Sequence, residues 1–129
     1  FKNIQIDAFI DPQVPGVTCH AASIESPLTL ADPSDSSVSC RQTGEITQAM
    51  IDDIDKSKDG EVIFTKSKSI FFKYMIRRIY DAENQTLLYV SYSTKETSGS
   101  FKHSLSTVPL WGTEAYKKPL PPLGDANQQ

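Results

Sequence analysis

The N-terminal part of the chain alternates between apolar and polar positions with a period of two. The segment NIQIDAFI, residues 3–10, has one face made of Ile4, Ile6, Ala8 and Ile10 and an opposite face made of Asn3, Gln5 and Asp7. This alternation predicts a half-buried strand whose isoleucine side is the packing face. Prolines and a glycine at residues 11–16 then predict a turn, and VTCHAAS resumes as a second strand. A third short strand is predicted at residues 38–43.

The period changes to that of a helix after the third strand. Apolar residues recur there at spacings of three, four and eight: Ile46, Ala49, Met50 and Ile54. Such spacing places them on one side of a helix. Thr47 suits the N-cap, Lys56 the negative end and Gly60 the stop. We therefore predict a single helix at about residues 47–56.

Aromatic and β-branched residues dominate from residue 61 to residue 110, which favours strands. The predicted strand segments are EVIFTK, SIFFKYMIRRIYD, TLLYVSYST and FKHSLSTVPL. A turn at residues 82–85 predicts a hairpin between the second and third of these segments. The expected fold is β-rich α+β, in which a strongly twisted antiparallel sheet or a partly closed barrel packs on the single helix.

The expected core joins the helix to the sheet. The residues predicted to be buried together are Ile46, Met50 and Ile54 from the helix and Ile63, Phe72, Leu88 and Val90 from the sheet. A chain of 129 residues is one domain by length. That domain is predicted to span residues 1–111. Prolines and few apolar residues at 112–129 predict an extended or disordered tail.

Charge and hydropathy exclude two classes of partner. A net charge of −3 gives no general attraction to nucleic acid. The three basic residues of KYMIRRIY, residues 73–80, are interpreted as partners of nearby acids. No apolar run approaches the about 20 residues that cross a bilayer, so no membrane span is predicted. The chain begins at Phe1 directly before a predicted strand, which suggests that a leader was removed.

Cys19 and Cys40 are the two cysteines of the chain, one on each of two predicted strands. An even count suits one disulfide, which in the chain-entropy model stabilises by about 3 kcal/mol and implies an oxidising compartment. Two independent buried thiols fit the count equally well. The cysteine count alone leaves both readings open.

Several separated segments in a fixed order resemble the CreA family of small bacterial proteins, over about residues 2–109. The segments are VTC, DPSDSSVSCRQTG, GEVIFTK, RRIYD, LLYVSYS and GSFKHSLSTVP. The resemblance implies export to the periplasm with a signal sequence, and a disulfide between Cys19 and Cys40. The connection AASIESPLTL is shorter than is usual in the family and lacks glycine, so the shape of that loop is not implied. The family has no established activity, so no mechanism is implied either.

The serine-rich segment before Cys40 offers one catalytic hypothesis, a hydrolase. Its candidate nucleophiles are Ser34, Ser36, Ser37 and Ser39, with His20 or His103 as base and Asp32 or Asp35 as orienting acid. No glycine-flanked nucleophile elbow surrounds any of these serines. Serine and aspartate also cap their own backbone in turns, which favours a structural loop. We therefore predict no catalytic residue.

The segment DKSKDGEVIFTK, residues 55–66, resembles a calcium-binding loop in its first half. Asp55, Ser57 and Asp59 occupy the first, third and fifth positions. The twelfth position requires a bidentate carboxylate, and this chain has Lys66 there. We predict no metal site and no cofactor.

The favoured hypothesis is a non-catalytic, extracytoplasmic module of the cell envelope that binds a small ligand or a protein partner. A guanidinium next to hydroxyl groups is a common way to hold a carboxylate or phosphate. The predicted binding residues are Asp35, Ser36, Arg41, Arg78 and Tyr92.

Overall fold

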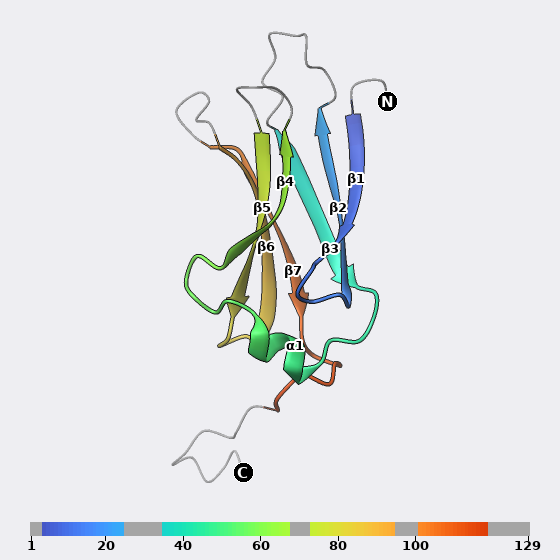
Figure 1. The fold of residues 1–129 in the computed structure, drawn as a ribbon, viewed down its shortest axis with the longest axis vertical. Coiled ribbons are helices and arrows are strands. Elements are labelled where there is room, and N and C mark those ends of the chain that lie inside the picture. The colour runs from blue at the N-terminus through green and yellow to red at the C-terminus, as the bar shows by residue number, and fades with distance from the viewer. Residues whose placement is uncertain (1–3, 25–34, 68–72, 95–100, 119–129) are drawn as a thin grey trace, which may run out of the picture.

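The chain forms two antiparallel sheets and one short helix in the computed structural model, which describes residues 4–24, 35–67, 73–94 and 101–118 (Figure 1). The elements are β1 (Ile4–Ile10), β2 (Val17–Ile24), β3 (Ser36–Gln42), α1 (Gln48–Asp53), β4 (Glu61–Ser67), β5 (Lys73–Asp81), β6 (Thr86–Ser93) and β7 (His103–Pro109). One sheet has the order β1-β2-β3 and the other β4-β5-β6-β7. The β-rich fold with a single helix is thus confirmed for the described residues.

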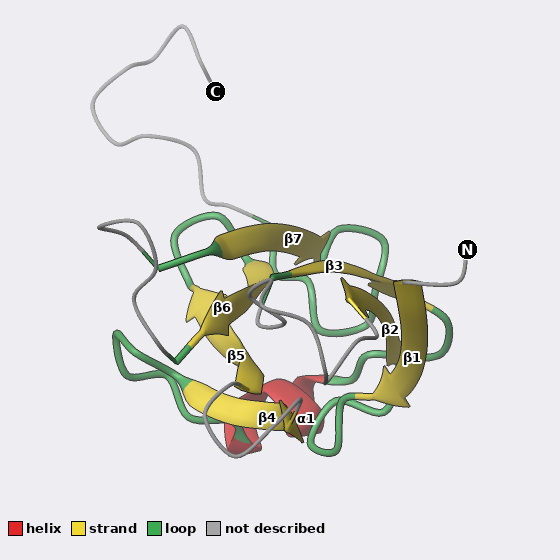
Figure 2. Cartoon of the chain, turned by 90° about the horizontal axis from the view of Figure 1, so that it is seen from above, coloured by secondary structure: helices red, strands yellow, loops and turns green. Residues whose placement is uncertain are grey.

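The two sheets face each other and are joined by side chains at both seams, so the described strands do not close into a hydrogen-bonded barrel. At one seam β3 lies beside β7 (Figure 2). There the backbone N–H groups of Val38 and Cys40 donate to the hydroxyls of Ser104 and Ser106, at 3.1 and 2.8 Å. These bonds satisfy the edge of β3 without a backbone ladder.

The second seam lies between β1 and β4, the outer edges of the two sheets. The rings of Phe9 and Phe64 stack there with centroids 4.3 Å apart. Next to them, Asp7 accepts from Lys66 Nζ at 3.3 Å and from the Tyr74 hydroxyl at 3.4 Å. Side-chain packing and one partly buried ion pair therefore hold this seam.

The helix is shorter than predicted and lies at one end of the two sheets (Figure 1). Thr47 is the N-cap, as predicted, and its hydroxyl accepts the N–H of Met50 at 3.3 Å. Helical geometry ends at Asp53, because Ile54 takes an extended conformation and Lys56 Nζ donates to the carbonyls of Asp52 and Ile54. Six residues are too few to cover a sheet, so the helix packs against one end of the core, where Ile51 is buried, and does not lie across a sheet face.

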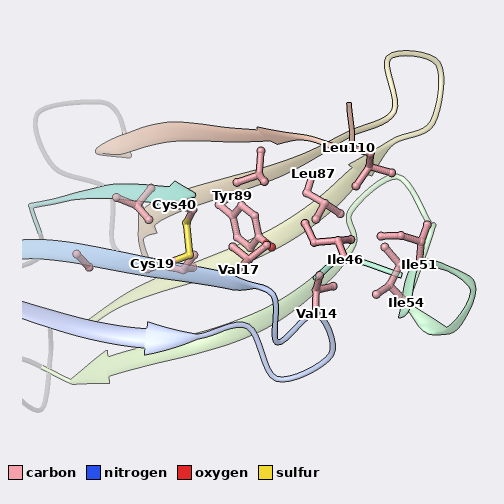
Figure 3. Close-up of a cluster of buried hydrophobic side chains, with 14 of the residues drawn as sticks. Val14, Val17, Cys19, Cys40, Ile46, Ile51, Ile54, Leu87, Tyr89 and Leu110 are labelled. Atoms are coloured by element: carbon pink, nitrogen blue, oxygen red, sulfur yellow. A yellow bond between two sulfur atoms is a disulfide. The ribbon is translucent and has the colours of Figure 1, made fainter. Parts of the chain in front are cut away.

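The core lies between the sheets and extends to the helix (Figure 3). Its largest buried apolar side chains are Val14, Val17, Ile46, Ile51, Ile54, Tyr74, Ile76, Leu87, Tyr89 and Leu110. Ile46 and Ile54 are buried as predicted, while Met50 and Ile63 are partly buried. Phe72 lies outside the described residues.

Leu88 and Val90 were predicted to be core residues, and this prediction is wrong. Along β6 the buried positions are Leu87, Tyr89 and the two serines that follow at the same spacing, so Leu88 and Val90 lie on the other face and are only half-buried. Both faces of TLLYVSYS carry apolar residues, and apolar content could not choose between them. The Tyr89 hydroxyl donates to the buried Asp11 carboxylate, and this favours the face with the serines.

A buried ionic cluster connects the two sheets. The Arg78 guanidinium of β5 has no exposed area, and its Nε and Nη2 donate to the two carboxylate oxygens of Asp11 at 2.8 and 3.2 Å. Its other bonds go to Glu61 at 2.6 Å and Gln13 at 2.7 Å. Tyr89 donates its hydroxyl to Asp11 at 2.8 Å, and burial together with the Asp11 charge raises the pKa of this phenol. A buried charge persists only when it is paired in this way.

The same Asp11 carboxylate organises the turn after β1. It accepts the backbone N–H groups of Gln13 and Val14 at 3.0 and 3.3 Å. Four strands, β1, β4, β5 and β6, are therefore tied to one another through Asp11 and Arg78.

Asp11 also fixes which face of β1 points inward. Side chains alternate along a strand, so an inward Asp11 brings Phe9, Asp7 and Gln5 to the same side. The burial pattern follows this alternation, since these three are partly buried. The predicted packing face of β1 is exposed instead: Ile4 by 46%, Ile6 by 64% and Ile10 by 57%. The expectation of an inward isoleucine face is wrong.

Part of the predicted tail packs at the end of the molecule that carries α1, against Ile46 and the β5–β6 turn. Ala115 is 3% exposed and donates its N–H to the Ile46 carbonyl at 3.2 Å. The N–H of Lys117 donates to Gln85 Oε1 at 2.8 Å. The packed chain therefore continues past residue 111, and residues 119–129 lie outside the described part.

Replacing Asp11 with alanine is expected to lower the free energy of unfolding by about 3–5 kcal/mol, because Arg78 then stays buried without its carboxylate. Urea unfolding of the oxidised protein measures the loss. Asp35→Ala is the control: this exposed carboxylate lies 3.7 Å from Lys102 Nζ, so about 1 kcal/mol or less is expected. Equal losses in the two variants would contradict the structural role of Asp11.

High pH is expected to weaken the seam at Asp7. Burial and the Asp7 charge raise the pKa of Tyr74 to about 12, whereas an unfolded tyrosine titrates near about 10. The protonated phenol is favoured by folding, so its contribution is complete below about pH 10 and is lost as the pH rises towards 12. Urea unfolding at several pH values should show a shallower decline between pH 10 and 12 in Tyr74→Phe. An identical decline in both proteins would remove Tyr74 as a cause.

Candidate functional site

Because the isoleucine side chains of β1 point outward, the sheet β1-β2-β3 has an apolar area on its outer surface. We call it the isoleucine face and define it by the side chains that alternate outward on the three strands: Ile4, Ile6, Ala8, Ile10, Thr18, His20, Ala22, Ile24, Ser37, Ser39 and Arg41. The register places Ile4 opposite Ile24 and Ile6 opposite Ala22. Large exposed aliphatic side chains in one cluster are typical of an interaction site.

The isoleucine face continues onto β7, the neighbour of β3. Leu105 of β7 is 60% exposed and alternates with the inward Ser104 and Ser106, which bond to β3. Aliphatic side chains therefore flank a central strip of small hydroxyl residues on β3.

One end of the face is hollowed. A depression of about 220 Å³ is lined by Ile4, Ala22, Ser23, Ile24, Asp35, Ser36 and Ser37. Ligand pockets for free small molecules usually measure about 300–1,000 Å³. This depression is smaller, and it suits one or two aliphatic side chains better than a free metabolite.

The face is poor in negative charge although the chain carries a net charge of −3. None of its eleven side chains is a carboxylate, and Arg41 is its cation. Asp35 stands at the rim of the depression, where Lys102 Nζ lies 3.7 Å from its carboxylate. The face is therefore neutral to weakly positive.

Three of the five predicted binding residues lie on or next to β3, but at its two different ends. Asp35 and Ser36 line the depression, and Arg41 lies at the other end of the isoleucine face on β3. Arg78 is fully buried in the cluster with Asp11, where a surface ligand cannot reach it. Tyr92 lies on the outer face of the other sheet, where Arg77 Nη2 donates to its hydroxyl at 3.2 Å.

Sequence reasoning missed the isoleucines as functional candidates. Their alternation was read as a core signal, which it usually is. Phe9 stands in the row with Gln5 and Asp7 and was the one local sign that this row could face the core.

The hydrolase hypothesis finds one geometric match. Ser39 is the cross-strand partner of His20, and both side chains are exposed on the isoleucine face. No hydrogen bond joins them within the described residues, and Ala8 lies on the other side of His20, where an orienting carboxylate would stand. His103 Nδ1 lies 2.9 Å from the Phe101 carbonyl. Ser34 and Asp32 lie outside the described residues, and the hydrolase alternative stays untested.

The calcium-like loop is built from local hydrogen bonds. Asp55 accepts the N–H of Ser57 at 2.8 Å, and hydrogen bonds from Ser57 lower the pKa of this carboxyl. Lys66, at the twelfth position, reaches across to Asp7. Among the residues that the structure describes, no three metal-ligating side chains are grouped.

A second hollow of about 430 Å³ lies at the opposite end, between α1, the β5–β6 turn and residues 115–118. Its rim mixes charges of both signs, from Lys56, Lys117, Lys118, Asp52 and Glu83. Lys56 is already engaged by two backbone carbonyls. Charges of both signs around this hollow favour neither an anionic nor a cationic ligand, so the isoleucine face is the stronger candidate. No helix within the described ranges is long and apolar enough to span a membrane.

Comparison with known proteins gives a consistent family match. The sequence model of the family described as CreA protein matches residues 1–113. Protein CreA of Escherichia coli K12 is 41% identical over 115 residues, which cover 83% of this chain and 72% of that protein. Protein CreA of Escherichia coli O157:H7 matches with the same values. No solved structure matches.

The isoleucine face should contribute little to the stability of the chain itself. Ile6→Thr is expected to change the free energy of unfolding by about 0.5 kcal/mol or less, because Ile6 is 64% exposed. Ile76→Thr is the matched control, since Ile76 is fully buried and the change leaves a cavity and a buried hydroxyl. A loss of about 2 kcal/mol or more is expected there. A large loss in Ile6→Thr would mean that Ile6 is a core residue.

Proposed function

The chain belongs to the CreA family, and we propose that it is a non-catalytic module of the bacterial cell envelope that binds a protein partner on the isoleucine face. The observation that carries the proposal is the exposure of Ile4, Ile6 and Ile10 on one side of one strand. Nothing in the described part of the chain covers them. Exposed apolar clusters of this kind lose unfavourable water contact when a partner binds.

The dimensions of the face suit a small or transient interface. Three paired strands spaced about 4.8 Å apart and seven residues long at about 3.4 Å each, together with a similar width for the neighbouring β7, give a projected area of roughly 450 Å². Both partners together then bury about 1,000 Å², the lower end of the range for specific complexes. We therefore expect a reversible complex rather than an obligate one.

Shape and charge favour a protein over a small ligand. The depression at the end of the face takes an aliphatic side chain, as an anchor of a larger partner would supply. Arg41 and the row of hydroxyls on β3 offer polar contacts around the apolar part. This combination of an apolar patch and polar surroundings resembles protein interfaces.

The proposed envelope location is supported by the disulfide. Cys19 and Cys40 are directly opposed in the β2–β3 register and are bonded, with both sulfurs in the core. Structural disulfides are typical of proteins in oxidising compartments, the periplasm among them.

Site-specific photocrosslinking in the native host tests the proposal. A photoreactive amino acid at position 6 is expected to give a discrete product with one protein, because this side chain points into the interface. Leu88 is the control position, since it is half-exposed on the outer face of the other sheet. The proposal is wrong if position 6 yields no product, or yields the same products as position 88.

A further inference from the structure

The backbone hydrogen bonds of β1 show which of its groups face away from β2. Asp11 donates its N–H to the Val17 carbonyl at 3.1 Å, directly after the last pair of the β1–β2 register. In an antiparallel pair, bonded residues alternate with residues whose N–H and C=O point away. Phe9, Asp7 and Gln5 therefore bond to β2 together with Asp11. The four residues that alternate with them direct their backbone groups to the free edge: Ile4, Ile6, Ala8 and Ile10.

The backbone groups of this edge are unpaired among the described residues, although side chains of β4 meet Phe9 and Asp7 beside the strand. β1 is the terminal strand of its sheet, and the structure gives these four residues no hydrogen-bond partner on that side among the described residues. Natural edge strands are usually blunted by lysine, proline, a bulge or an inward charge. β1 has no lysine or proline, and its register with β2 is unbroken. Its one inward charge, Asp7, is already paired with Lys66.

The other edge of the same sheet, β3, has hydrogen-bond partners for its outward N–H groups. Val38 and Cys40 of β3 have outward N–H groups too, and these donate to the hydroxyls of Ser104 and Ser106 of β7, respectively. Side chains of β7 therefore satisfy the N–H groups of one edge of the three-stranded sheet, while the outward backbone groups of the other edge have no such partner in the described part of the chain. An uncovered edge with an apolar outer row is the arrangement that accepts an added strand.

We propose that the partner on the isoleucine face contributes an extended segment that adds to the free edge of β1 as a further strand. This inference rests on the proposed function and adds that the partner binds through a segment in β conformation. Residues of the segment opposite Ile4, Ile6, Ala8 and Ile10 lie on the same outer face, so aliphatic residues at every second position extend the apolar row.

The pair of Asp7 with Lys66 disfavours an acidic segment and a second copy of this chain, because the one positive charge of Lys66 already compensates Asp7. Two copies of β1 paired antiparallel through all four edge residues would place Asp7 opposite its own counterpart, and like charges directly opposite destabilise a sheet. The matching segment therefore carries neutral or basic residues, and no acidic one, between its aliphatic positions.

The experiment measures binding of a synthetic nine-residue peptide to the full oxidised chain by fluorescence anisotropy. The peptide alternates valine with threonine and ends in lysines. Saturable binding is expected, with amide shifts at Ile6 and Ala8 in NMR spectra. A peptide with glutamate in place of threonine should bind about tenfold more weakly, because its carboxylates lie beside Asp7.

Two matched controls test the edge bonds themselves. Ala8→Pro removes an N–H that points to the free edge and leaves the bonds to β2 in place, as edge strands allow. It should weaken binding about tenfold, whereas Ala8→Val should stay within about twofold. If Ala8→Pro does not fold, a peptide N-methylated on its pairing edge removes the same bonds from the other side and should lose binding.

The outcomes separate this inference from the proposed function. Binding that is lost in Ile6→Thr but kept in Ala8→Pro and with the methylated peptide would mean docking on the face alone, which overturns the added strand only. Absence of binding by every peptide would also overturn it, while photocrosslinking at position 6 decides the proposed function separately. Self-association of the native chain that the peptide competes away would assign the edge to a second copy and contradict the proposal.

Discussion

The pairing of Asp11 with Arg78 is the constraint on which the arrangement of this protein depends. Two buried charges from different sheets meet in the interior, and Glu61, Gln13 and Tyr89 complete their hydrogen bonds. Burial of the pair is tolerated only with this full set of partners, because either charge alone would be strongly unfavourable. The net contribution of such a pair to the free energy of folding is small, because desolvation of the two charges offsets their attraction. Its main effect is to fix the relative position of the two sheets.

The same pair decides what β1 shows to the outside. Asp11 follows β1 directly, and with its carboxylate held inside, the alternation of the strand carries Phe9 and Asp7 inward, where Phe64 and Lys66 meet them. The isoleucines are left outside and their backbone groups point to an open edge. About half or more of each of Ile4, Ile6 and Ile10 stays exposed, so these side chains pack only partly within the chain, and the proposed partner would bury the rest.

Local sequence patterns predicted well where the strands and the helix lie along the chain, but they predicted poorly which side chains of β1 and β6 point into the core. Proline and glycine turns, β-branched runs and the Thr47 cap are local signals, and they placed the strands and the start of the helix correctly. The facing of β1 depends on Arg78, which is 67 residues away from Asp11 along the chain, so no window around NIQIDAFI contains it. The interpretation of Arg78 as a partner of acids is confirmed, but its prediction as a ligand-binding residue at the surface is wrong, because no local signal showed that Asp11 would bury it. The facing of β6 escaped prediction for the same reason, since Tyr89 is held by Asp11.

Hydrogen exchange of the β1 backbone amides, followed by NMR on the monomeric oxidised chain, tests the facing of this strand most directly. The account predicts slow exchange at Asp7 and Phe9, whose N–H groups bond to β2, and fast exchange at Ile6 and Ala8, whose N–H groups point to the open edge. Slow exchange at Ile6 and Ala8 with fast exchange at Asp7 and Phe9 would mean that the isoleucines face the core, and it would contradict the account.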